Sequence, residues 1–80
     1  MDVFQQVGKT IQQRRSQLRI TQGQLSDMAE ISINTLYKIE RGQGNPTLQS
    51  LFKIADILGL ELVLQVKQKE NKLGNETSGN

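Results

Sequence analysis

The sequence predicts a small all-α domain of four helices, followed by one short β-strand. Apolar residues recur at every third or fourth position in four segments, which is the period of an α-helix. Serine or threonine precedes three of these segments and glycine follows two of them, as is common at helix ends. In residues 60–67 the apolar residues alternate instead, which is typical of a strand. We therefore expect one domain over residues 1–67 and a disordered tail over residues 68–80.

The composition excludes most kinds of metal site and many kinds of enzyme. The chain has 80 residues, with 10 Lys and Arg against 8 Asp and Glu, and it contains neither Cys nor His. The commonest metal-ligand sets, thiol redox chemistry, disulfide bonds and catalytic triads with a histidine base are therefore excluded. We expect no enzyme activity, no metal, no cofactor and no small-molecule substrate.

Hydropathy and charge favour a cytoplasmic protein with a basic first half. No apolar run approaches the roughly 18 to 20 residues that cross a bilayer, and residues 1–18 lack the apolar stretch of a signal peptide. We therefore expect no membrane association. Between positions 9 and 41 lie six basic residues and three acidic ones. Most such clusters are solvated helix faces, so only their geometry decides whether they bind anything.

The first helix is expected near the N-terminus. One of its faces carries Phe4, Val7, Ile11, Arg15 and Leu18. Spacings of three or four residues place these side chains on one side, which is apolar except for the arginine. The charge of Arg15 on this face requires a partner.

The second helix is expected to begin after Thr21, its N-cap. Gln24 stands three residues later and completes the pattern of a capping box. The inner face of this brief helix is expected to contain Leu25, Met28 and Ala29.

The third helix is expected to begin after Ser32, its N-cap, and to stop at Gly42. Its inward positions are Leu36 and Ile39, three residues apart. The second and third helices are thus two short helices joined by a turn of three or four residues, which are the dimensions of a helix-turn-helix.

The fourth helix follows a loop at residues 42–46, because two glycines and a proline cannot continue a helix. Thr47 is its expected N-cap and Gly59 its expected end. Its wide apolar face is formed by Leu48, Leu51, Phe52, Ile54, Ala55 and Leu58.

The alternating segment at residues 60–67 places four apolar side chains on one face of a strand, namely Leu60, Leu62, Leu64 and Val66. A lone strand cannot satisfy its backbone hydrogen bonds, so its partner must come from another molecule. The economical arrangement is a homodimer in which two copies pair antiparallel and cover the helical cores. The alternative is a fifth short helix that completes a monomeric core.

The residues that define these helices resemble the phage-repressor/Cro type of DNA-binding domain, the Xre family, over about residues 4–59. The resemblance is carried by Thr21-Gln22, Leu25, Ile31-Ser32, Leu36, Ile39-Glu40-Arg41-Gly42, Asn45-Pro46-Thr47-Leu48 and Ile54-Ala55. It implies a dimeric, sequence-specific repressor that binds double-stranded DNA at an inverted-repeat operator, on the bacterial nucleoid.

The strand-like extension resembles HipB-type antitoxins of the same family. This resemblance implies an autoregulator that also holds a HipA-like kinase toxin. Two alternatives stay open, namely an Xre-type regulator without a toxin and a protein-interaction module with only secondary DNA binding.

Burial of Leu36 and Ile39 turns the rest of the third helix toward solvent, and in relatives these positions face the major groove. The exposed set is Ile33, Asn34, Thr35, Tyr37 and Lys38. Asn34 suits the edge of adenine and Lys38 suits guanine or a phosphate. Ile33 suits a thymine methyl group, or else is a hydrophobic staple or core residue. The alternative for the polar members is an ordinary solvated face.

Phosphate contacts are expected on either side of this helix. Gln22 lies in the first turn of the second helix, where its amide and free backbone N–H groups can donate to a phosphate. Ser32 and Tyr37 are further phosphate contacts. A second clamp is expected from Arg41 and the loop that follows it, including Gln43 and Asn45 and the exposed backbone N–H groups of residues 42–45.

The family resemblance also supplies a partner for Arg15. It corresponds to a family arginine that pairs with the glutamate ending the recognition helix, here Glu40. The alternative is two unrelated surface charges. Arg19 and Glu30 stand where relatives often have glycine with positive φ, so these turns are either strained or locally different. Ser26 stands where the family usually has alanine, because two helices cross closely there.

Overall fold

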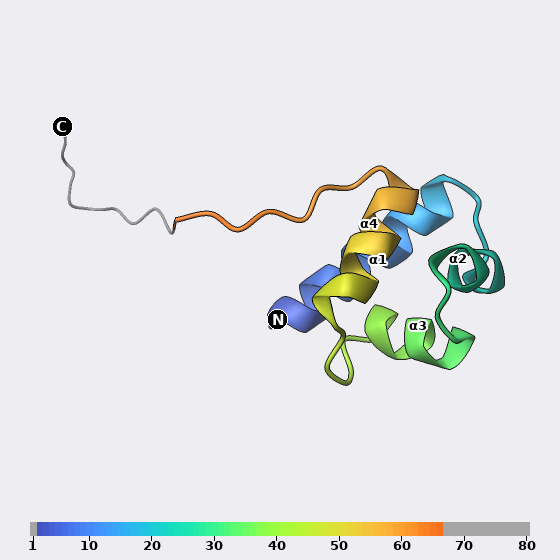
Figure 1. Ribbon diagram of the computed structural model, residues 1–80, viewed down its shortest axis with the longest axis horizontal. Helices are drawn as coiled ribbons and strands as arrows, with labels where there is room; N and C mark the ends of the chain where they lie inside the picture. The colour runs from blue at the N-terminus through green and yellow to red at the C-terminus, as the bar shows by residue number, and fades with distance from the viewer. Residues whose placement is uncertain (1, 67–80) are drawn as a thin grey trace, which may run out of the picture.

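The computed structural model describes residues 2–66 and contains four helices in that range. These are α1 (Val3–Gln17), α2 (Gln22–Ala29), α3 (Ile33–Glu40) and α4 (Leu48–Leu58). Helices α1 and α2 each pack on both α3 and α4 (Figure 1). Within residues 2–66, none of the helices is long and apolar enough to cross a membrane. The all-α prediction is confirmed.

The predicted N-caps are confirmed, because each side-chain oxygen accepts a hydrogen bond from the backbone N–H three residues later. The distance is 3.0 Å for Thr21, Ser32 and Thr47 alike. Gln24 Oε1 in turn accepts a hydrogen bond from the Thr21 backbone N–H at 2.9 Å, which completes the capping box. Asp2 caps α1 by accepting from the Gln5 N–H at 2.8 Å, a contact that the sequence analysis missed.

The core lies where the four helices meet and contains Ile11, Leu25, Ala29, Leu36, Ile39, Ile54 and Leu58. Several residues expected on inner faces are instead exposed, with relative exposures of 50% for Met28, 64% for Leu48 and 52% for Phe52. Phe4 and Leu18 are also exposed, at 43% and 39%. The apolar faces of these helices are wider than the neighbouring helices can cover, so the residues at their margins remain in contact with solvent.

Two turns adopt the left-handed conformation at residues other than glycine. Arg19 has a φ of 58° between α1 and α2, and Glu30 has a φ of 59° at the end of α2. The strained alternative is therefore the correct one, and it costs about 1 kcal/mol at each residue.

The segment after α4 extends away from the helical body (Figure 1). Leu60 packs against the core, whereas Leu64 and Val66 are 99% and 91% exposed. Residues 60–66 form neither a strand nor the alternative fifth helix. Pairing of the segment with a second copy stays a prediction. Residue 67 and the tail expected at residues 68–80 lie outside the described residues.

Candidate nucleic-acid interface

Helices α2 and α3 are joined by a tight turn, and buried residues from both helices hold them together. Leu25 and Leu36 have no exposed surface, and Ala29 and Ile39 are 1% and 4% exposed. Ser26 is only 3% exposed, and its hydroxyl donates to the Gly23 carbonyl of its own helix at 3.0 Å. The small serine therefore fits the crossing without an unsatisfied polar group.

The side of α3 opposite Leu36 and Ile39 is exposed. We call it the outer face of α3, and it consists of Ile33, Asn34, Thr35, Tyr37 and Lys38. Asn34 and Lys38 are one turn apart, so their side chains project side by side. Ile33 is 54% exposed, which excludes its alternative assignment as a core residue.

The hydroxyl groups of Ser32 and Thr35, at the start of α3, are hydrogen-bonded to each other. Ser32 Oγ donates to Thr35 Oγ1 at 2.8 Å and accepts from the Thr35 backbone N–H. Because this arrangement uses most of the hydrogen-bonding capacity of Ser32, the residue positions the start of α3 and keeps one acceptor site free.

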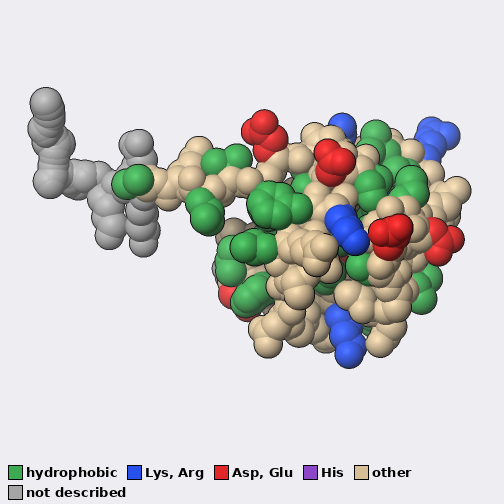
Figure 2. Space-filling model, viewed as in Figure 1, with side chains coloured by type: hydrophobic (Ala, Val, Ile, Leu, Met, Phe, Trp, Pro, Cys, Tyr) green, Lys and Arg blue, Asp and Glu red, His purple; other side chains and the backbone are tan. Residues whose placement is uncertain are grey.

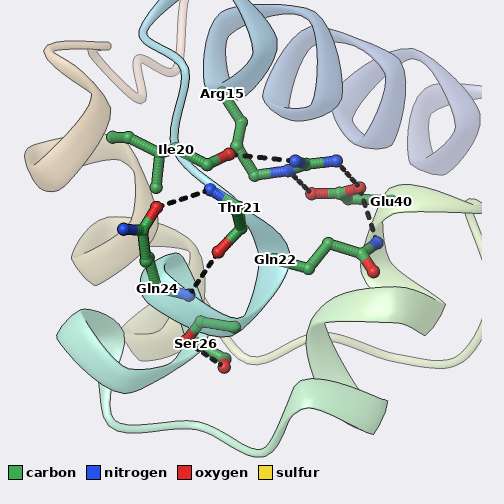
Figure 3. A network of polar contacts seen from close by, with 8 residues as sticks. Arg15, Ile20, Thr21, Gln22, Gln24, Ser26 and Glu40 are labelled. Atoms are coloured by element: carbon green, nitrogen blue, oxygen red, sulfur yellow. Dashed lines mark hydrogen bonds and ion pairs between the residues drawn. The ribbon is translucent and has the colours of Figure 1, made fainter.

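Arg15 and Glu40, the two residues expected to pair, lie together between α1 and α3 (Figure 3). Arg15 Nε and Nη2 donate to the two Glu40 carboxylate oxygens at 2.7 and 3.0 Å. Arg15 Nη1 donates to the Ile20 carbonyl at 3.0 Å. The side chains are only 15% and 3% exposed, so the alternative of two unrelated surface charges is wrong.

Gln22 joins the same network from α2. Its Nε2 donates to Glu40 Oε1 at 3.0 Å, and its side chain is partly buried (Figure 3). The Glu40 carboxylate thus accepts three hydrogen bonds from two other elements of the fold. One of the two amide hydrogens of Gln22 is therefore engaged with protein, and the other remains free for a ligand.

The loop after α3 differs in part from the expected phosphate clamp. The backbone N–H groups of Gly42 and Gln43 donate to the Ile39 and Lys38 carbonyls at 3.0 and 2.8 Å. These hydrogen bonds close the end of α3, so the two N–H groups are not free to bind a phosphate as expected. The side chains of Arg41, Gln43 and Asn45 are nevertheless exposed. The Arg41 guanidinium lies over the Tyr37 ring, 5.3 Å from its centroid.

Sequence reasoning missed two residues that position α3 and α4. A Cβ atom on Gly8 would lie 2.7 Å from the Glu40 carbonyl oxygen and would also overlap the Ile39 carbonyl oxygen. Helix α1 therefore contacts the end of α3 directly through its backbone. Arg14 Nε donates to the Leu58 carbonyl at 2.8 Å, which stabilises the C-terminal end of α4. Gly8 could have been noticed because it shares the helix face of Phe4, Ile11 and Arg15.

Comparison with known proteins finds similar sequences elsewhere. The profile of the family described as helix-turn-helix matches residues 11–65. A protein of Methanococcus maripaludis is 32% identical over 56 residues, which are 70% of this chain and 17% of that protein. Its name is HTH-type transcriptional regulatory protein, marked as provisional.

Two phage proteins are also similar. The cryptic phage CTXphi transcriptional repressor RstR of Vibrio cholerae is 39% identical over 49 residues, which cover 61% of this chain and 44% of that protein. The immunity repressor protein of Bacillus phage phi105 is 38% identical over 56 residues, which cover 70% of this chain and 39% of that protein. The chain thus matches less than half of the length of each of these three relatives.

Proposed function

The chain belongs to the helix-turn-helix family, of Xre type, and from this we propose that it is a DNA-binding transcriptional regulator that acts as a repressor. The observation that carries the proposal is the exposed outer face of α3, held in place by the buried network of Arg15, Gln22 and Glu40. The names of the two phage relatives, both repressors, support the same function. In this proposal the protein acts on the nucleoid, in the cytoplasm.

The outer face of α3 supplies the base contacts in this proposal. Asn34 donates to and accepts from the N6/N7 edge of adenine, and Lys38 donates to O6 or N7 of guanine. Ile33, exposed at 54%, contacts a thymine methyl group. Thr35 accepts a hydrogen bond from Ser32, and its own hydroxyl hydrogen is free to reach the nearest base or sugar.

Phosphate contacts flank these base contacts. They include Gln22, through its free amide hydrogen and the start of α2, and Ser32, whose hydroxyl hydrogen turns from Thr35 to the phosphate. Tyr37 and Arg41, whose side chains are exposed, line one hollow together with Gln22, and the exposed Gln43 and Asn45 follow in the loop after α3. Because each phosphate neutralised by a basic side chain releases counterions, log K should decline with log salt by about 0.9 for each such phosphate.

The proposed regulator is a homodimer on an inverted repeat. Apolar side chains line the extended segment after α4 and the adjoining side of the helical body (Figure 2). They include the exposed Val3, Phe4, Val63 and Leu64, which line one hollow, the exposed Phe52, which lines another with Val63, and the exposed Val66 of the segment itself. Pairing of residues 60–66 with a second copy would cover this surface and satisfy the backbone of the segment. Two recognition helices would then meet half-sites about 34 to 36 Å apart, or a multiple of that.

A narrower proposal is that the regulator is also the antitoxin of a HipA-like kinase toxin. It depends on the resemblance of residues 60–67 to the strand of HipB-type antitoxins. Co-expression with the product of a neighbouring kinase-like gene and affinity purification tests it. A stoichiometric complex supports the antitoxin, and purification of the regulator alone favours a regulator without a toxin.

Selection of bound fragments from random double-stranded DNA tests the main proposal. A repressor of the proposed kind enriches one inverted repeat with half-sites spaced by a whole number of helical turns. Failure to enrich any sequence, with equal affinity for all duplexes, contradicts sequence-specific repression and favours the interaction module with secondary DNA binding.

A further inference from the structure

An open polar hollow lies where α1, α2 and α3 meet, beside the outer face of α3. It is lined by Gln12, Gln22, Tyr37, Glu40 and Arg41. Three of these residues already have a place in the proposed DNA contacts, and Glu40 belongs to the buried ion pair. Gln12 is the one contribution from α1, and nothing in the proposed function yet accounts for it.

The charges in the hollow favour an anion. The Glu40 carboxylate would by itself repel one, but Arg15 neutralises it through two hydrogen bonds and Gln22 supplies a third. Arg41 is the remaining charge among the lining residues, and its guanidinium is held over the Tyr37 ring. The net charge of the hollow, with Arg15 and Glu40 cancelling, is therefore positive.

The donors around this charge come from different helices. Gln22 has a free amide hydrogen, and the exposed Gln12 lines the same hollow from α1. Two amides and a guanidinium around one hollow offer N–H donors that suit the oxygens of a tetrahedral phosphate.

We propose that this hollow holds one backbone phosphate of the DNA and that Gln12 of α1 donates a hydrogen bond to it. The inference rests on the proposed function and adds α1 to the DNA-binding surface. Tyr37 belongs both to the hollow and to the outer face of α3, so a duplex whose bases meet Asn34 and Lys38 runs its backbone past Gln12.

The chain provides a matched control for this role. Gln13 is also an exposed glutamine of α1, adjacent in sequence to Gln12, but it does not line the hollow. We therefore compare Gln12→Ala with Gln13→Ala, and Gln12→Lys with Gln13→Lys, in the full chain. Both members of each pair change charge and helix propensity equally.

Binding is measured by fluorescence anisotropy on the selected operator and on a random duplex, at several salt concentrations. Loss of a hydrogen bond to a charged group predicts that Gln12→Ala weakens binding about tenfold on both DNAs, whereas Gln13→Ala changes it less than about twofold. Gln12→Lys replaces a neutral phosphate contact by a charged one and should steepen the salt slope by about 0.9 relative to Gln13→Lys. Unchanged thermal unfolding of all four variants shows that the fold is intact.

A second measurement identifies the phosphate itself. Operators that carry a single neutral methylphosphonate at successive positions are bound by the wild type and by Gln12→Ala. At one position the substitution should weaken DNA binding by the wild type but leave binding by Gln12→Ala almost unaffected, because that variant has already lost the contact.

The two kinds of failure are distinguishable. If the wild type binds operator but Gln12→Ala behaves like Gln13→Ala, or if no methylphosphonate is coupled to Gln12, the inference about the hollow is wrong and the proposed function stands. If the wild type binds no DNA at all, the proposed function is wrong and the inference is overturned with it.

Discussion

The backbone of Gly8 in α1 lies directly against the Glu40 carbonyl at the end of α3, at a place where a Cβ atom would be 2.7 Å from that oxygen. One face of α1 therefore holds the end of α3 twice, through this backbone contact and, two turns later, through the Arg15 guanidinium. The neighbouring Arg14 holds the end of α4 through the Leu58 carbonyl. Helix α1 thus fixes the position of the helix whose outer face we propose to contact DNA.

Gly8→Ala should destabilise the domain. The added methyl group would overlap backbone atoms that cannot rotate away, and overpacking of this kind costs about 1 to 3 kcal/mol. The melting temperature, measured by circular dichroism, should fall by about 4 to 8 °C for each kcal/mol.

Gly23→Ala is the control, because the nearest atom to a Cβ there is Thr21 Oγ1 at 3.8 Å. It should raise stability by about 0.5 to 1 kcal/mol, the usual gain of alanine over glycine inside a helix. Equal melting temperatures for Gly8→Ala and the wild type would show that α1 and α3 can move apart to admit the methyl group without any loss of stability.

Arg15→Ala should lower stability and DNA affinity together. It leaves the Glu40 carboxylate buried at 3% exposure without its charge partner, at a cost of about 3 to 5 kcal/mol. Urea unfolding and operator binding measure the two effects. An unchanged unfolding midpoint would mean that the pair behaves as a surface feature.

The double variant Arg15→Met/Glu40→Met distinguishes the effect of removing the whole ion pair from the effect of removing one charge and leaving the other buried. Because it leaves no unpaired buried charge, it should be less destabilised than the sum of the two single variants. Strict additivity would show that the two side chains do not depend on each other.

Arg41→Ala should weaken binding to all DNA sequences by a similar factor. In the proposed function its guanidinium, held over Tyr37, contacts a phosphate and reads no base. The slope of log K against log salt should become shallower by about 0.9. Gln43→Ala, an exposed neutral neighbour, is the control for the slope, which it should leave unchanged. A change of base preference in Arg41→Ala would place the residue among the base contacts instead.

Leu64→Asp should convert the proposed dimer into a folded monomer. Leu64 is 99% exposed in the single chain, so the change leaves the helical core intact while charging the surface that would pair. Sedimentation equilibrium should show one chain, and binding to an inverted repeat should weaken toward that of a single half-site. Gln65→Asp adds the same charge at the adjacent position and should remain dimeric. A wild type that sediments as a monomer at all concentrations would contradict the dimer.

Local features of the fold could be predicted from the sequence, and features that depend on distant segments could not. Thr21, Ser32 and Thr47 were assigned correctly because a cap is decided within three residues. Met28 and Leu48 were assigned wrongly because periodicity gives the direction of a helix face but not how much of it the neighbours cover.

The site shows the same division between local and distant contacts. The exposed outer face of α3 follows from the inward positions of Leu36 and Ile39, so it could be predicted. The pairing of Arg15 with Glu40 needed the family resemblance, because 25 residues separate them in the sequence. The contacts of Gly8 with α3 and of Arg14 with α4 depend on helix crossings that no local pattern encodes.

The most direct test of the central claim measures the wild type and Lys38→Ala against operators that carry every single base-pair substitution in one half-site. If the outer face of α3 lies in the major groove, Lys38→Ala loses discrimination at one or two adjacent base pairs, worth about 1 to 3 kcal/mol, and keeps the wild-type preference elsewhere. If Lys38→Ala instead retains the full preference at every base pair, Lys38 reads no base, which contradicts the base contact proposed for it on this face.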